Sequence, residues 1–155
     1  VVVPIWRDEA ILPALEAAIN AVVPEPNRFC AFRLHGTFER VRTRSVPAQH
    51  KPYRPLAEIA KEQPEFDLLA VRGTLIGFRA PPFVKGVNVP GYHMHFLADD
   101  LGSGGHVLSF DLAEGTLELD TVHDWLHVVL PGGSDAFATA DLSRDRTQEL
   151  ESVEK

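Results

Sequence analysis

Two stretches of the chain have the apolar spacing of a helix. Between Asp8 and Val22, apolar residues recur every three or four positions, at Ile11, Leu12, Leu15, Ala18, Ile19 and Val22. Pro13 stands close to the first turn, and prolines follow at positions 24 and 26, so this segment predicts one amphipathic helix. A second, shorter helix is predicted between Pro55 and Pro64, with Leu56, Ile59 and Ala60 on one side.

The other segments rich in apolar residues predict strands, and residues 28–44 have the apolar period near two that is typical of strands. Residues 28–44 predict two short strands around the turn Leu34-His35-Gly36-Thr37, and Phe66–Phe78 predicts paired strands that approach closely at its glycines. Val1 and its neighbours also suggest a strand. Further strands, separated by turns with Gly or Asp, are expected at Gly91–Ala98, His106–Leu112, Thr116–Val122 and Trp125–Leu130.

Composition and charge exclude several classes of protein. The net charge of −7, with no basic stripe, argues against a nucleic-acid partner. No apolar run approaches the roughly 20 residues needed to span a bilayer, so we expect a soluble chain without a membrane partner. Cys30 is the single cysteine, and its neighbours Phe29 and Phe32 predict a buried thiol on a strand.

Three histidines form the strongest candidate site for chemistry. His93 and His95 are two residues apart in a predicted strand, so their side chains point to the same face. The glycine-rich segment Asp99–Gly105 can reverse the chain and bring His106 beside them. Three neutral imidazoles suit zinc, and also iron, copper, nickel or cobalt, and leave coordination positions open for water or substrate.

The remaining histidines are interpreted as structural or solvated. A lone histidine is more often a hydrogen-bonded structural residue than a metal ligand. His123 and His127 are four residues apart beside Trp125, and we expect both to be structural or exposed. His35 and His50 fall in a predicted turn and in a proline-rich loop, where a solvated side chain is the usual outcome.

The elements together predict an α+β fold that is predominantly β. We expect a mixed or antiparallel sheet with a barrel-like metal-binding region and one or two flanking helices. No repeat or shift in composition marks a second domain, so residues 1–139 are predicted to form a single domain. Residues 140–155 are polar and charge-dense and predict a C-terminal tail.

Four segments of the sequence resemble the α-acetolactate decarboxylase family. They are Arg42–Pro47 (RTRSVP), Gly73–Pro81 (GTLIGFRAP), Gly86–Phe96 (GVNVPGYHMHF) and Gly104–Val107 (GGHV). The resemblance covers nearly the whole chain, and the last two patterns at this spacing are more specific than any single segment.

The resemblance implies roles for individual residues. It makes the three histidines zinc ligands and matches Arg44 to an arginine that faces the substrate, with Arg42 as a structural neighbour. The family also uses two glutamates near zinc. Glu154 best matches the glutamate of the C-terminal tail, while Glu149 and Glu151 match it less well.

An N-terminal part of the family pattern has no counterpart in this sequence. That part contains the second glutamate, a glycine-rich segment and several strands. The sequence also begins at Val1, inside a predicted strand and without a methionine. We therefore expect either a fragment of a longer protein or a short homologue that retains zinc, and the sequence leaves both open.

The activity implied is zinc-dependent decarboxylation of 2-acetolactate, a 2-hydroxy-3-keto acid, to acetoin and carbon dioxide. The implied context is a bacterial cytoplasmic enzyme, with export of a longer precursor left open. A homodimer is expected for a different reason, because a truncated sheet would expose an edge or apolar face that a second subunit could cover. Two alternatives remain. The spacing His93-x-His95-x-x-x-Asp99 partly resembles the metal motif of cupin dioxygenases and isomerases, although the third histidine follows sooner than in a cupin. A module that binds metal or a small ligand without turnover is the other alternative.

Overall fold

The structure is a computed structural model of the 155-residue chain, and it describes residues 1–6, 12–121, 127–130, 135–143, 145, 147 and 148. The strands are β1 (Val2–Trp6), β2 (Cys30–Arg44), β3 (Glu65–Ala80), β4 (Gly91–Ala98) and β5 (Gly104–Asp120). The α-helices are α1 (Leu12–Val22), α2 (Leu56–Ile59) and α3 (Asp135–Ala138). Two 3-10 turns, η2 (Ala60–Glu62) and η3 (Pro82–Val84), follow α2 and β3.

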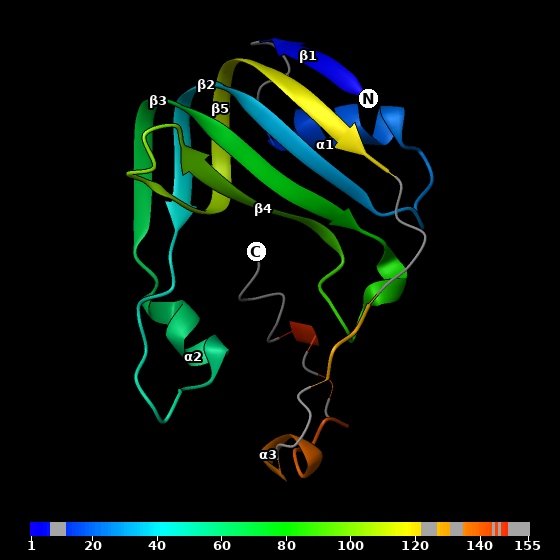
Figure 1. Ribbon diagram of the computed structural model, residues 1–155, viewed down its shortest axis with the longest axis vertical. Helices are drawn as coiled ribbons and strands as arrows, with labels where there is room; N and C mark the ends of the chain where they lie inside the picture. Colours follow the sequence, from blue (N-terminus) through cyan, green and yellow to red (C-terminus); the bar gives the residue numbers. More distant parts are fainter. Residues whose placement is uncertain (7–11, 122–126, 131–134, 144, 146, 149–155) are drawn as a thin grey trace.

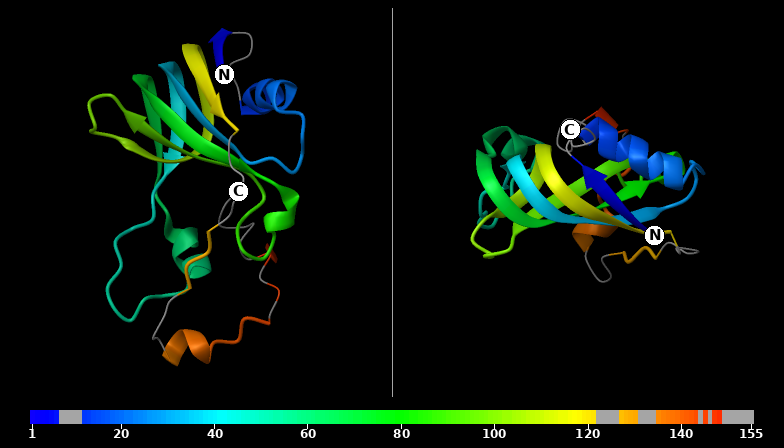
Figure 2. Two further views of the ribbon diagram at one scale, coloured as in Figure 1. Left: turned by 45° about the vertical axis from the view of Figure 1, so that its right-hand side comes forward. Right: turned by 90° about the horizontal axis from the view of Figure 1, so that it is seen from above.

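The five strands form one antiparallel sheet in the order β1-β5-β2-β3-β4. Strand β4 also pairs with β5, through residues 95–97 and 104–106, so four of the strands curl into a ring that closes at this point (Figures 1 and 2). The predicted α+β fold, predominantly antiparallel β with a barrel-like region and flanking helices, is confirmed. None of the helices in the described part of the chain is long and apolar enough to cross a membrane.

The core lies on the inner face of the curled sheet and under α1. Leu15 and Ile19 of this helix are buried, as is Cys30 at the start of β2, where burial raises the pKa of the thiol. The predicted helix is thus confirmed over residues 12–22, while its first predicted turn lies outside the described residues. Val22 was expected on the packed side but is 39% exposed, because the chain leaves the helix there and buries Val23 instead.

The buried guanidinium of Arg79 attaches the end of α1 to the sheet. It donates hydrogen bonds to Asn20 Oδ1 at 2.8 Å and to the carbonyl oxygen of Val23 at 2.6 Å. It also donates to the carbonyl oxygens of Glu25 and Arg28. These carbonyls lie at the negative end of the helix dipole or just beyond it, so a cation stabilises this end of α1.

Three predicted strand breaks are wrong, because β2, β3 and β5 each run on as one long strand. The turn predicted around Gly36 is the middle of β2, where this glycine faces Gly73 on β3 and Gly115 on β5. A Cβ atom at position 36 would lie 2.2 Å from the carbonyl oxygen of Glu114. The glycine therefore permits close approach of neighbouring strands in a strongly curved sheet rather than a turn.

Other predictions away from the core have mixed outcomes. The short helix after Pro55 is confirmed by α2 and η2, and the N-terminal strand by β1. The strand predicted over Trp125–Leu130 is wrong for residues 127–130, which are irregular, and its first two residues lie outside the described residues. The division into a domain of residues 1–139 and a tail of residues 140–155 stays a prediction.

The close approach at Gly36 can be tested with an added methyl group. We expect Gly36→Ala to lower the free energy of unfolding by at least about 2 kcal/mol, because both nearest atoms, at 2.2 and 2.8 Å, belong to the backbone of β5. Urea unfolding measures the change. Gly102→Ala is the control, since its nearest neighbour is the Asp100 carboxylate at 3.3 Å, and it should change stability by no more than about 0.5 kcal/mol. A Gly36→Ala protein as stable as the parent would contradict the packing argument.

Candidate metal centre

The hairpin formed by β4 and β5 brings the three histidines together. His93 and His95 point away from the core, whereas Met94 between them is buried, as the two-residue period of a strand requires. His106 lies directly opposite His95 in the β4–β5 pairing. Residues directly opposite each other in an antiparallel pair share a face, so all three imidazoles lie on the outer face of the ring.

The turn between the strands is tightly hydrogen-bonded. Asp100 Oδ1 accepts a hydrogen bond from the backbone N–H of Gly102 at 2.8 Å, and Ala98 receives one from the backbone of Leu101 at 3.0 Å. The backbone N–H of Ala98 in turn donates to the carbonyl oxygen of Ser103 at 2.9 Å. The predicted chain reversal over Asp99–Gly105 is therefore confirmed, and it determines which residue of β5 meets His95.

The distances within the cluster suit one metal ion. Nε2 of His93 and Nε2 of His95 are 3.1 Å apart, and one ring nitrogen from each of the three residues lies within 4.8 Å of the others. Ligands about 2.0–2.1 Å from a tetrahedral zinc ion are separated by about 3.3 Å, so the His93–His95 pair has the spacing of two ligands of one such ion. His95 is exposed and the other two rings are half-buried, which leaves one side of the site accessible.

Arg44 lies on the same face, on strand β2 next to His106 of β5. It pairs with His106 in the β2–β5 register, while Thr43 beside it is fully buried and points into the core. Arg42 forms an ion pair with Glu65, with Nε 2.9 Å from the carboxylate. The pairing of β2 with β5 shifts register between Arg42 and Thr43. Arg42 therefore lies opposite Ser109, whereas Arg44 lies opposite His106. Contact between Arg44 and a substrate stays a prediction.

Glu154, the other catalytic residue proposed from the sequence, lies outside the described residues, as do Glu149 and Glu151. His123 and Trp125 also fall outside the described residues.

The described histidines outside the cluster have different surroundings. His50 is exposed in an irregular segment and His127 is exposed, as predicted. The prediction for His35 is wrong, because it lies in the middle of β2 rather than in a turn. Its Nε2 accepts a hydrogen bond from Arg72 at 3.2 Å, since a guanidinium can only donate. Its Nδ1 therefore carries the proton and donates to Thr74 Oγ1 at 3.0 Å.

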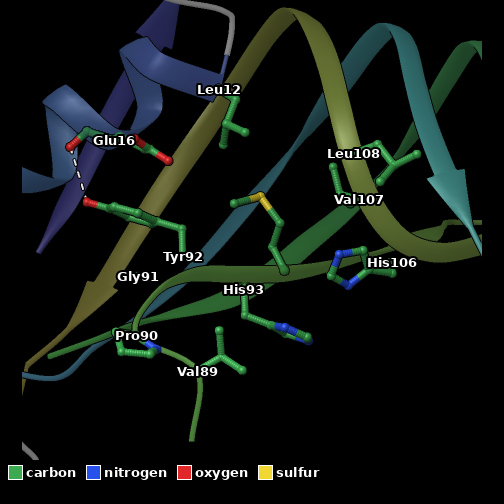
Figure 3. Close-up of a pocket in the computed structure, with 11 residues that line it drawn as sticks. Leu12, Glu16, Val89, Pro90, Gly91, Tyr92, His93, His106, Val107 and Leu108 are labelled. Carbon is green, nitrogen blue, oxygen red and sulfur yellow. Dashed lines mark hydrogen bonds between the residues drawn. The ribbon is translucent and has the colours of Figure 1, made fainter. Parts of the chain in front are cut away.

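Several neighbours of the histidines were missed from the sequence. Ile76 and Phe78 of β3 pair with His95 and His93, and both apolar side chains are about half exposed on the outer face. A cavity of about 450 Å³ also borders His93 and His106 and extends to Glu16 on α1 (Figure 3). The strand neighbours are determined by the register of β3 and β4, and the cavity by the position of a helix about eighty residues away in the sequence. The pattern of apolar and polar residues gives no signal for either.

Metal binding should stabilise the fold, because all three ligands come from the hairpin that closes the ring. With zinc at about 100 times its dissociation constant, we expect the free energy of unfolding to rise by about 2.7 kcal/mol. Urea unfolding with zinc and with a chelator measures the difference. His95→Ala should abolish the rise, whereas His50→Ala, in an exposed segment, should retain it. An equal rise in the His95→Ala protein would place the metal elsewhere.

Comparison with known proteins agrees with the resemblance noted in the sequence. The family model described as alpha-acetolactate decarboxylase matches residues 6–144. The chain is 40% identical to an alpha-acetolactate decarboxylase of Methylococcus capsulatus over 150 residues, which is 97% of this chain and 57% of that protein. It is 43% identical to the Methanosarcina mazei protein of the same name over 146 residues, 94% of this chain and 50% of that protein.

The fold also matches that of a solved protein with the same name. The crystal structure of alpha-acetolactate decarboxylase from Bacillus subtilis strain 168 superimposes with a TM-score of 0.89 at 34% sequence identity. The match covers 99% of this chain and 65% of that one. The chain thus spans about half the length of the curated relatives it matches. This chain belongs to the alpha-acetolactate decarboxylase family.

Proposed function

We propose that this chain carries the zinc site and the substrate-binding arginine of an enzyme that converts 2-acetolactate to acetoin and carbon dioxide. The single observation that carries the proposal is the cluster of His93, His95 and His106, with ring nitrogens within 4.8 Å of one another, in a chain of this family. Three protein ligands leave coordination positions open, as a catalytic rather than a structural zinc site requires.

The histidines would hold the ion on the outer face of the ring, next to the cavity. When bound there, zinc supplies Lewis-acid stabilisation of the negative charge that develops on the substrate's oxygens. The half-buried rings of His93 and His106 border the cavity, so a substrate at the open positions would be partly enclosed.

Arg44 is proposed to hold the carboxylate that is lost. Its guanidinium can donate two parallel hydrogen bonds to that group, which orients the bond between the carboxyl carbon and the hydroxylated carbon. As carbon dioxide leaves, the bonding electron pair passes toward the adjacent carbonyl group and gives an enediolate. The pairing of Arg44 with His106 supports this role, because it places the arginine on the histidine face.

Glu154 is proposed to deliver the proton that completes the reaction. The carbon that loses the carboxylate must gain one proton to give acetoin, and a carboxylic acid near that carbon can supply it. The glutamate would then be protonated again from solvent. This assignment rests on the match of Ser152-Val153-Glu154 to the family's C-terminal pattern.

A homodimer is also proposed, on the basis of an apolar strip beside the histidines. Ile76, Phe78 and Leu97 lie on the outer face of neighbouring strands and are 55%, 52% and 49% exposed. Exposed apolar groups gathered in one place are suited to burial against a second subunit.

A second candidate function is a module that binds metal or a small ligand without turnover. It is favoured by the coverage of the relatives, since this chain spans about half of their length. Residues required for turnover in those proteins can lie in the part that this chain does not match. Metal binding is common to both candidate functions, whereas acetoin formation separates them.

Acetoin release from racemic 2-acetolactate by the zinc-loaded chain tests the proposal directly. We expect acetoin to form with about one zinc ion per chain, and to be lost in a His93→Ala, His95→Ala double variant. A protein with His50→Ala is the matched control and should remain active. Zinc binding without acetoin would favour the binding module, and absence of both would overturn the metal site.

The role of Arg44 can be separated from metal binding. We expect Arg44→Ala to lower kcat/KM by about 100- to 1000-fold, because the carboxylate loses its paired donors, while zinc content stays unchanged. Arg33→Ala is a suitable control on the same strand, since Arg33 forms a bidentate ion pair with Glu118 at 2.8 and 2.9 Å. Steady-state kinetics with metal analysis makes the comparison. Similar losses in both variants would argue against a direct role for Arg44.

A further inference from the structure

The third histidine reaches the other two by a different route from theirs. His93 and His95 lie on one strand, and β3 pairs with that strand along its whole length, from Gly91 to Ala98. His106 lies on β5, which meets β4 at only three residue pairs. It also pairs with Arg44 of β2, but β2 and β4 are separated by β3 in the sheet. The turn between β4 and β5 is therefore the direct link that places the imidazole of His106.

Asp99, the first residue of this turn, is attached to β3 at two points. Its backbone N–H donates to the carbonyl oxygen of Arg72 at 3.0 Å, one step beyond the last β3–β4 pair, Gly73 with Ala98. Its carboxylate Oδ2 lies 3.3 Å from Nε of the same arginine. Figure 1 shows the turn beside β3, at the end of the ring. One residue of β3 thus holds both the backbone and the side chain at the point where the chain leaves β4.

Arg72 is itself held by β2. It donates from Nη2 to His35 Nε2 at 3.2 Å and from Nη1 to Thr37 Oγ1 at 3.5 Å. Nδ1 of His35 lies 3.8 Å from Asp99 Oδ1, so the imidazole contacts both members of the ion pair. An isolated exposed ion pair contributes little, because two long side chains must be ordered for one contact. Here one guanidinium serves partners on β2 and in the turn, so less freedom is lost for each contact.

The cluster of His35, Arg72 and Asp99, called the turn anchor below, can influence the metal ligands through the hairpin backbone. Asp99 is four residues from His95 and seven from His106 in the sequence. The turn between them is stiff, because the backbone N–H of Ala98 donates to the carbonyl oxygen of Ser103 at 2.9 Å. A change of direction at Asp99 would therefore carry the start of β5 with it and move His106 relative to β4.

We propose that Arg72 and Asp99 are positioning residues for the metal centre and that they act through His106. This rests on the proposed function in one respect, because the three histidines must hold one metal ion. With the turn anchor intact, His106 lies beside His95 and all three imidazoles bind the ion. Without it, the turn leans away from β3. The ion then keeps His93 and His95 but is bound by His106 for a smaller fraction of the time.

Zinc affinity, measured by competition with a coloured chelator, tests the role of the turn anchor. We expect Asp99→Ala and Arg72→Ala each to weaken zinc binding by about threefold to tenfold. Asp99→Asn keeps an oxygen that can accept from Arg72, and it should restore the affinity to within about twofold of the parent. Parent affinity in the Asp99→Ala protein would overturn the proposal.

Glu118→Ala is the matched control. It removes an ion pair with Arg33 on the outer face of the same sheet, with side chains 54% and 44% exposed against 58% and 46% for Arg72 and Asp99. Zinc affinity should stay within about twofold of the parent, because this pair lies away from the turn. The urea midpoints of Glu118→Ala and Asp99→Ala, measured with a chelator present, should be alike. A loss of zinc affinity in both variants would show a general effect of removing surface charge and overturn the assignment.

A double-mutant cycle identifies the ligand through which Asp99 acts. In a His106→Ala background, we expect Asp99→Ala to change zinc affinity by less than about twofold, because the residue that it positions is gone. In a His93→Ala background, the full effect of Asp99→Ala should remain. Equal effects in the two backgrounds would overturn the assignment to His106.

These measurements need no turnover, so they separate the turn anchor from the proposed activity. If the variants behave as expected but no acetoin forms from 2-acetolactate, the decarboxylation fails and the positioning role stands. If the parent and Asp99→Ala proteins bind zinc equally, the positioning role fails and the metal site stands. A parent protein that binds no zinc would overturn both.

Discussion

Strand β4 meets strand β5 at only three residue pairs, and one of them joins His95 to His106. That contact closes the ring of strands and assembles the metal cluster at the same time. Without it, β4 would be an edge strand held by β3 alone, and His106 would have no reason to approach the other two histidines. The local turn from Asp99 to Gly105 sets the register of the contact, so the geometry of the site depends on the backbone of one hairpin.

The alternation of side chains along the strands divides the molecule into an apolar inside and a polar outside. Met94, Phe96 and Ala98 of β4 fill the core, while the histidines between them face outward. On β2, which pairs with β5, Thr43 is buried and Arg44 lies on the histidine face. A slip of one residue in either pairing would bury the polar groups and expose the core, so core packing also maintains the site.

The sequence predicted local features well and long-range ones poorly. The convergence of the three histidines followed from a two-residue period and a glycine-rich turn, both within fourteen consecutive residues. The breaks predicted in β2 and β5 failed because glycine marks turns and also marks close strand approach, as at Gly36, whereas the close approach predicted at the glycines of β3 is confirmed at Gly73 and Gly77. Only the neighbours of Gly36, on strands far away in sequence, distinguish a turn from a close approach of strands. The cavity was missed for the same reason, since α1 reaches the histidines only through tertiary packing.

The residues proposed for the site come partly from one hairpin and partly from segments far from it in the sequence. All three histidines come from one hairpin, and hairpin pairing needs little support from elsewhere once the core has formed. Arg44 is added by a single further strand. The carboxylate proposed for proton transfer, Glu154, is instead more than forty residues from that hairpin in the sequence. Under the proposed function, metal binding and substrate orientation would therefore persist when proton transfer is impaired, so zinc content and acetoin formation can be measured as separate properties.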